Sequence, residues 1–219
     1  TTPQNATNQL ACGLVHSHLT GHSTLVAMKK KIFILLGNPD KESFTGELAH
    51  IYDEAARMAG HETRCMSIGD MKFNPVLEKG YKVIQGLEPD LKDMQANVQW
   101  CDHILVVYPN WWCSMPAKLK GMFDRAWLPG FAFNFEKETK EVTQHMKGKT
   151  ARVVVTAGTL SPFMTWWNFG DFTNEISRGI LGFAGFSVAV STFGPCDHCA
   201  PEEKESWKQL MKVLGKSGT

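Results

Sequence analysis

Short apolar runs alternate with amphipathic stretches along most of the chain. Three runs are apolar throughout, at residues 32–36, 104–108 and 153–155, as expected for strands that are buried on both faces. Two further runs, 62–68 and 188–193, mix polar and apolar residues, which is typical of strands at the edge of a sheet. The segments between these runs carry apolar residues at three- and four-residue spacing, so they are predicted to be helices.

Five helices are predicted from this spacing. The first has an apolar face made of Leu48, Ile51, Ala55 and Met58, and Gly60 follows as a left-handed C-terminal cap. The second spans residues 89–100, and the third begins near Pro116 and buries Leu119, Met122, Phe123, Ala126 and Trp127. The last two bury Ile176, Ile180, Leu181 and Ala184, and Trp207, Leu210, Met211 and Leu214.

This alternation predicts an α/β protein with a parallel sheet. Five strands with polar edges fit a flavodoxin-like, doubly wound sheet in the order 2-1-3-4-5, with helices on both faces. Such sheets bind ligands beyond the carboxyl ends of the strands, where the strand order reverses. A ligand site is therefore expected at the loops 37–46, 109–116 and 156–171.

The first 27 residues show neither a helical nor a strand period. They also lack the basic region and apolar region of a secretory signal. Met28, which three lysines follow, looks like a natural start. Residues 1–27 are therefore expected to be a disordered or non-native leader, and residues 28–219 a single flavodoxin-like domain.

Composition argues against several classes of partner. The 219 residues include 23 basic and 22 acidic ones, a net charge of +1, which gives no footprint for nucleic acid or an anionic membrane. No stretch approaches the roughly 18 apolar residues of a membrane span. Six scattered cysteines in a chain of this size are expected to be reduced thiols, which predicts a cytoplasmic protein.

The loop at 37–46 matches neither glycine-rich nucleotide fingerprint, but it ends at a helix N-terminus that carries Ser43 and Thr45. Hydroxyl and backbone N–H groups at such a position can bind an anion. An ordinary N-cap uses the same residue types. The carboxylates of Asp40 and Glu42 also oppose an anion unless they point away, so both interpretations stay open.

Two adjacent tryptophans, Trp111 and Trp112, follow the third predicted strand. A flat conjugated ring such as a flavin needs apolar walls and a few backbone donors, and this loop can supply both. The alternative is that both indoles pack on neighbouring helices.

The stretch YPNWWCSMPAKLKGMFDR at 108–125 and its continuation LPGFAF at 128–133 resemble the NAD(P)H:quinone oxidoreductase family. The resemblance extends from about Lys31 to Leu214. It is strongest to short bacterial members, which include ancillary flavoproteins of glutathione-gated potassium efflux systems. It implies a flavin-dependent enzyme that oxidises NAD(P)H and reduces quinones or similar small aromatic acceptors by ping-pong hydride transfer. The cofactor would be non-covalent FMN, with FAD as the alternative.

The resemblance also implies which residues contact the flavin. Its phosphate would be held by Asn38, Ser43, Phe44 and Thr45, although the family usually has His at the position of Asn38. The ring would lie against Pro109, Asn110, Trp111, Trp112 and Cys113. Its pyrimidine edge would contact Thr156, Ala157 and Gly158.

Family members are homodimers with active sites at the interface, which implies a substrate slot made of Phe133, Phe135, Phe163 and Phe169. Larger relatives place a Tyr and a His for proton handling where this chain has Phe163 and Phe169. Neither phenylalanine can exchange a proton. No catalytic residue is therefore assigned, and protons are expected to come from water.

Two other functions remain open. A flavodoxin-type electron carrier would bind the same cofactor, although such carriers are typically acidic. A regulatory flavoprotein subunit of a potassium efflux system would bind a membrane antiporter. The sequence does not choose between NADH and NADPH, nor does it identify the physiological acceptor.

Cys196 and Cys199 form a CxxC motif after the fifth predicted strand. A zinc site needs about four ligands, and no second pair lies nearby in the sequence. A redox dithiol usually lies in a thioredoxin-like unit, which is absent here. The two thiols are therefore interpreted as incidental, and no metal site is expected.

Overall fold

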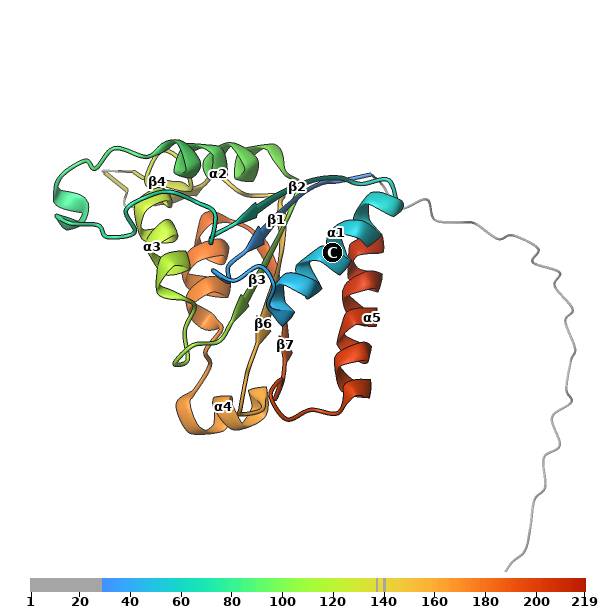
Figure 1. Cartoon of the computed structure of the whole chain (residues 1–219). Coiled ribbons are helices and arrows are strands. Elements are labelled where there is room, and N and C mark those ends of the chain that lie inside the picture. Colours follow the sequence, from blue (N-terminus) through green and yellow to red (C-terminus); the bar gives the residue numbers. More distant parts are fainter. Residues whose placement is uncertain (1–28, 137, 140) are drawn as a thin grey trace, which may run out of the picture.

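A five-stranded parallel sheet forms the centre of the computed structural model, which describes residues 29–136, 138–139 and 141–219 (Figure 1). Its strands are β1 (Lys31–Leu36), β2 (Glu62–Ser67), β3 (His103–Pro109), β6 (Thr150–Thr156) and β7 (Ser187–Phe193). They lie in the order β2-β1-β3-β6-β7, and each neighbouring pair is parallel. The predicted fold class and strand order are confirmed. The expectations for residues 1–27 and Met28 lie outside the described residues.

The burial of each strand follows its composition. After Lys31, every residue of β1 is buried, and in β3 only Pro109 is partly exposed. The edge strand β2 carries no fully buried residue, and only Phe193 is buried in β7. Continuous apolar runs therefore occupy the middle of the sheet, where helices cover both faces.

Helices cover the sheet in two layers. Figure 1 shows α1 (Phe44–Met58) and α5 (Pro201–Ser217) on one side of the sheet, and α2 (Pro89–Trp100) and α3 (Ala117–Ala126) on the other. The π-helical segment η2 (Glu175–Gly182) joins the second layer through Ile176 and Leu181. Each layer has its own apolar core against the sheet.

Two predicted helix faces need correction. Met58 is 83% exposed, and the fully buried Tyr52 occupies the inner face of α1 instead. Met58 is the last residue of α1. In α5, Leu210 is 41% exposed, and Met211, Leu214 and Gly215 are the buried positions. Gly215 permits a close approach, because a Cβ there would collide with the Tyr52 carbonyl group.

Several short elements are not predicted from the sequence. They are the 3₁₀ turn η1 (Gly80–Lys82), the hairpin strands β4 (Phe133–Phe135) and β5 (Val142–Gln144), and the helix α4 (Pro162–Phe169). Strands of three residues are too short to show a period. In α4 only Thr165 is buried, so this helix has no buried apolar face that a periodic pattern could mark. The fourth predicted helix exists, but η2 is π-helical where an α-helix was expected.

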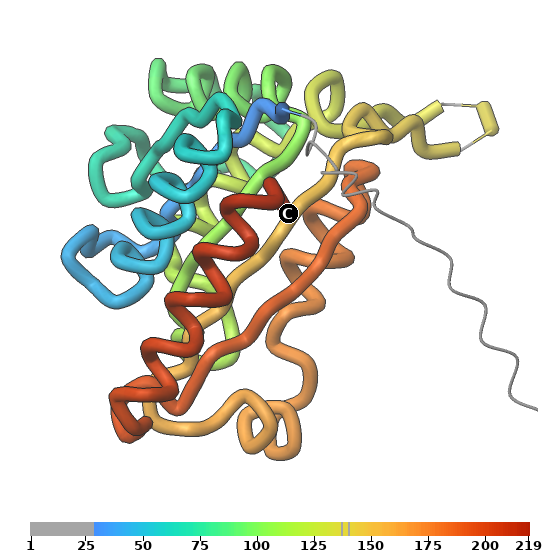
Figure 2. Tube along the Cα trace, turned by 90° about the vertical axis from the view of Figure 1, so that its right-hand side faces the viewer, coloured from blue at the N-terminus to red at the C-terminus, as the bar shows by residue number. Residues whose placement is uncertain are grey.

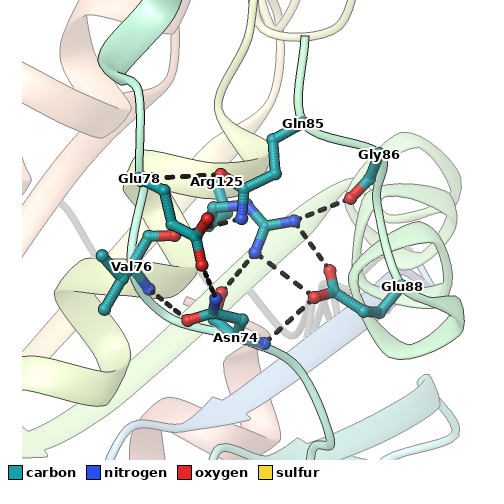
Figure 3. A network of polar contacts seen from close by, with 7 residues as sticks. All are labelled: Asn74, Val76, Glu78, Gln85, Gly86, Glu88 and Arg125. Atoms are coloured by element: carbon teal, nitrogen blue, oxygen red, sulfur yellow. Dashed lines mark hydrogen bonds and ion pairs between the residues drawn. The ribbon is translucent and has the colours of Figure 1, made fainter. Parts of the chain in front are cut away.

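Arg125 ties the loop at 74–88 to α3 (Figure 3). Only 1% of its side chain is exposed. Its Nη1 donates to the Asn74 carbonyl oxygen, and its Nη2 donates to the Gly86 carbonyl oxygen at 2.7 Å and to Glu88 Oε2 at 2.9 Å. Burial raises the pKa of Glu88, but hydrogen bonds from the Asn74 N–H and from Arg125 outweigh it and lower that pKa. The loop is thus held by a charged pair and two backbone carbonyls.

Arg125→Ala is expected to lower the free energy of unfolding by about 3 kcal/mol, because it removes the partner of the Glu88 carboxylate and the donors to the Asn74 and Gly86 carbonyls. Urea denaturation measures this loss. Lys120→Ala is the control on the same helix. Lys120 pairs with Asp124 at 2.7 Å in a partly exposed position, so its removal should cost less than about 1 kcal/mol. Equal losses in the two variants would contradict this account of the loop.

Candidate functional site

A cavity of about 650 Å³ lies at the carboxyl ends of the strands. Its walls come from the loops that follow β1, β3, β6 and β7 and from the first turn of α1. This is the edge at which a doubly wound sheet places its ligands, between the neighbouring strands β1 and β3. The volume is within the range of sites for small ligands and cofactors.

Three polar side chains at the start of α1 form a hydrogen-bonded group. Asn38 Nδ2 donates to Ser43 Oγ at 2.8 Å and to Thr45 Oγ1 at 2.7 Å, and the two hydroxyl oxygens are 2.8 Å apart. Asn38 and Thr45 are buried, so the group is fixed in place. Ser43 is also the N-cap, because its Oγ accepts the Gly46 N–H at 3.3 Å. The N-cap interpretation is confirmed, and anion binding by the same hydroxyls stays a prediction.

Two nearby carboxylates do not line this cavity. Asp40 Oδ1 accepts the Glu42 N–H at 2.9 Å, so the Asp40 side chain stabilises its own turn. Both residues are exposed. Neither carboxylate therefore opposes an anion in the cavity.

The loop after β3 is a tight hairpin that presents indole to the cavity. Trp111 N–H donates to the Ser114 carbonyl at 2.9 Å, and Ser114 N–H donates to the Trp111 carbonyl at 3.1 Å. The two central residues, Trp112 and Cys113, have φ values of 54° and 61°. Such a turn normally takes Asn and Gly, because non-glycine residues are strained at positive φ.

Both indoles line the cavity, and they are not packed under helices. Trp111 is 48% exposed and Trp112 is 100% exposed. The hairpin is anchored from outside, because Ser114 Oγ donates to Glu175 Oε2 at 2.8 Å. The packing alternative is therefore wrong for Trp112. Strain and exposure together are what a ligand-binding tip would show.

The loop after β6 closes the third side of the cavity. Asn110 N–H donates to the Thr156 carbonyl at 2.7 Å, which joins this loop to the one after β3. Among the described residues, the buried Asn110 Oδ1 has no hydrogen-bond partner. Gly158 lies close to the turn after β7, because a Cβ there would lie 2.7 Å from Asp197 Oδ2 and would displace that carboxylate.

Most of the predicted flavin contacts meet in this one cavity. Its lining includes Asn38, Ser43, Phe44, Thr45, Pro109, Asn110, Trp111, Trp112, Thr156 and Gly158. Cys113 and Ala157 are not in the lining, because Cys113 packs against the core and Ala157 is buried. Thr159, Cys196 and Asp197 also line it and were missed by sequence reasoning. Their position after a strand end was the available signal.

The four phenylalanines of the predicted substrate slot do not line this cavity within one chain. Phe133 and Phe135 pack against Phe183 and line a separate cavity of about 740 Å³ beside α3. Phe163 and Phe169 lie on α4 and are 64% and 63% exposed. The larger cavity is mainly apolar and lies away from the carboxyl ends of the strands, so the smaller one is the candidate site.

A sequence model of the family described as "flavodoxin-like fold" matches residues 30–213. The chain belongs to this family. It is similar to ribosyldihydronicotinamide dehydrogenase [quinone] of Mus musculus, with 27% identity over 217 residues. That alignment covers 85% of this chain and 93% of the relative. NAD(P)H dehydrogenase [quinone] 1 of Rattus norvegicus is 25% identical over 221 residues, and the alignment covers 84% of this chain and 77% of that relative. Its homologues therefore include NAD(P)H dehydrogenase (quinone) enzymes.

Solved structures of the flavodoxin-like family confirm the fold. The NAD(P)H:quinone oxidoreductase from Methanothermobacter marburgensis superposes with a TM-score of 0.74 at 22% identity, covering 87% of this chain and all of that one. A putative quinone reductase from Klebsiella pneumoniae superposes with a TM-score of 0.71 at 23% identity, covering 85% of this chain and 83% of that one. Among the described residues, no helix has the length and hydropathy needed to cross a membrane.

Trp112→Gly tests whether the exposed indole at the strained hairpin contributes to the stability of the fold. Glycine relieves the positive φ but adds freedom to the unfolded chain, so the free energy of unfolding should stay unchanged or rise by up to about 1 kcal/mol. Trp127→Ala, at a buried indole, should instead cost about 3–5 kcal/mol. A loss above about 1 kcal/mol in Trp112→Gly, measured by urea denaturation, would show that this indole supports the fold.

Proposed function

We propose that this protein is a flavin-dependent oxidoreductase that takes hydride from NAD(P)H and reduces a quinone or a similar small aromatic acceptor. One observation carries the proposal: an exposed indole tip and a buried hydroxyl group line the same cavity at the ends of β1 and β3. A flavin needs both, an apolar wall for its ring and donors for its phosphate. The names of the homologues support the nicotinamide and quinone substrates.

The residues of the cavity fit a non-covalent flavin. Ser43 and Thr45, ordered by Asn38, would hold a phosphate at the positive end of α1. The unpartnered Asn110 Oδ1 calls for a donor, and an N–H group of the flavin ring would supply one. FMN is proposed over FAD, because this first loop offers donors for one phosphate group.

The protein's own part in the reaction would be to position the flavin ring and to shield it within the cavity. A bound flavin would accept hydride and pass it on, which requires mainly stacking and distance. Trp111 and Trp112 would hold the ring, and the Gly158 backbone N–H would lie where negative charge develops on reduction. No described histidine or tyrosine lines the cavity, so protons would come from water at its open mouth.

Ser43→Ala combined with Thr45→Val should weaken FMN binding about tenfold or more, because charge-assisted hydrogen bonds contribute about 1.5–3 kcal/mol each. Quenching of flavin fluorescence measures the affinity. Thr63→Val is the control, since Thr63 lies on the edge strand β2, opposite Ile32 near the amino end of β1. Equal affinity in all three proteins would refute the phosphate site.

Turnover separates the enzyme from an electron carrier. Protein loaded with FMN should oxidise NADH or NADPH with a benzoquinone as acceptor. The decrease in nicotinamide absorbance measures this reaction. FMN binding without direct turnover would favour the carrier or a regulatory subunit. Failure to bind either FMN or FAD would defeat the proposal.

We also propose that the protein is a cytoplasmic homodimer whose active sites lie at the interface. The larger cavity is lined by large hydrophobic side chains that are exposed in the single chain, including Tyr81, Val83, Ile84 and Phe135. Ile84 is 99% exposed and Phe135 is 57% exposed. Contiguous apolar surface of this kind marks a partner site. A second chain there would cover Phe135 together with Phe133, which also lines this cavity.

Ile84→Glu should shift the protein from dimer to monomer, because it places a charge in an apolar interface. Sedimentation at several concentrations measures the equilibrium. Met58→Glu is the matched control: Met58 is 83% exposed on α1, in the opposite helix layer, and its substitution should leave the dimer intact. A monomeric parent protein, or the same shift in both variants, would contradict the proposed interface.

A further inference from the structure

The CxxC motif lies at the candidate flavin site. Cys196 lines the cavity, and Cys199 lies two residues before the start of α5. Residues 196–198 form a turn between β7 and α5. Figure 2 shows this turn at the same end of the molecule as α4, where the strands β6 and β7 end. The motif thus lies after the fifth strand of the sheet, as the sequence predicted, and at the edge of the candidate site.

The two cysteines lie three residues apart, at the ends of one turn. Cys199 Sγ lies 3.6 Å from the Cys196 carbonyl oxygen, so the Cys199 side chain folds back over the turn toward Cys196. The ends of a tight turn lie within about 7 Å of each other, and disulfides join Cα atoms about 4.4–6.8 Å apart. Both residues are free thiols of intermediate exposure, accessible to a small reagent.

The turn is bonded directly to the loop after β6. Cys196 N–H donates to the Ala157 carbonyl at 2.8 Å, and Asp197 N–H donates to the Gly158 carbonyl at 3.1 Å. Thr159 Oγ1 donates to Asp197 Oδ2 at 3.1 Å. A change in the turn must therefore alter the wall of the cavity at residues 157–159.

We propose that Cys196 and Cys199 form a reversible disulfide whose formation weakens flavin binding. The predicted effect on flavin binding rests on the proposed function, whereas the predicted disulfide does not. Each sulfur loses its proton, one bond forms between the two sulfurs, and a small disulfide such as oxidised glutathione is cleaved into two thiols. The two electrons lost by the cysteines are gained by the small disulfide, and a dithiol reverses the exchange.

Bond formation would displace a side chain that lines the site. A disulfide brings its sulfur atoms to about 2.05 Å, so the Cys196 side chain, whose Sγ donates to the Phe193 carbonyl oxygen at 3.7 Å, must leave that position and turn toward Cys199. Asp197 lies between them in the chain, so the bond from its N–H to the Gly158 carbonyl and the bond from Thr159 Oγ1 to its carboxylate would be strained as well. The cavity described above belongs to the dithiol form, and the disulfide form should fit the same ligand less well.

The rate of this exchange should depend on pH. Burial, and then the neighbouring Cys199 thiol, raise the pKa of Cys196 to about 11. At neutral pH Cys196 is therefore a protonated thiol. Only the thiolate attacks a disulfide, so oxidation should accelerate as the pH is raised from neutral into the alkaline range.

The test uses the whole chain, treated with oxidised or reduced glutathione. Intact mass and peptide mapping report the bond, and FMN fluorescence quenching reports affinity in each state. The oxidised protein should lose two hydrogens at the 196–199 peptide and bind FMN about tenfold more weakly, a change of about 1.4 kcal/mol. Dithiothreitol should restore the affinity.

Matched variants separate this pair from the other thiols. Cys199→Ser should bind FMN as the reduced parent does and should not respond to the oxidant. Cys65→Ser, at an exposed cysteine on β2, should respond as the parent does.

Three results would overturn the inference. They are the absence of a 196–199 bond after oxidation, a bond that leaves the FMN affinity unchanged, and a response that persists in Cys199→Ser. A bond that forms in a protein with no FMN affinity in either state would instead overturn the proposed function, and the effect on flavin binding with it.

Discussion

The parallel pairing of β1 with β3 is the constraint on which the candidate site depends. It brings together two loops that lie about 70 residues apart in the sequence, with Leu36 opposite Val107 in the register. Gly37 N–H then donates to the Val107 carbonyl at 2.7 Å, which fixes the point where the first loop leaves the sheet. A Cβ at Gly37 would lie 2.5 Å from Leu119, so this exit also needs glycine. Hydroxyls and indoles meet because these two strands are neighbours.

The rest of the fold holds the indole hairpin rigid at both ends. On one side the hairpin continues β3, and on the other it leads through Pro116 into α3. Arg125 anchors α3 to the loop at 74–88, and the Ser114–Glu175 bond anchors the hairpin to η2. The strain at Trp112 and Cys113 is thus maintained by a well-packed surrounding structure. A hairpin with a fixed backbone loses little freedom when a flat ring binds against it.

Sequence reasoning succeeded where a physical pattern repeats over many residues. The apolar runs 32–36 and 104–108 have one explanation, burial on both faces, and they predicted the strand order and the loops of the site. It failed where an element is short or where partners are distant in sequence. Nothing local marks Phe133 as a strand residue or Met58 as exposed. The CxxC pair was interpreted as incidental, because the sequence shows neither further metal ligands nor a thioredoxin-like unit. The bonds from its turn to Ala157 and Gly158 follow from the pairing of β6 with β7, which no local pattern reveals.

A crystal structure of the protein with FMN tests the central claim most directly. The account predicts the phosphate within hydrogen-bond distance of the Ser43 and Thr45 hydroxyls, and the ring against the indoles of Trp111 and Trp112. A flavin bound in the larger cavity beside α3, or one whose phosphate lies away from the start of α1, would contradict it.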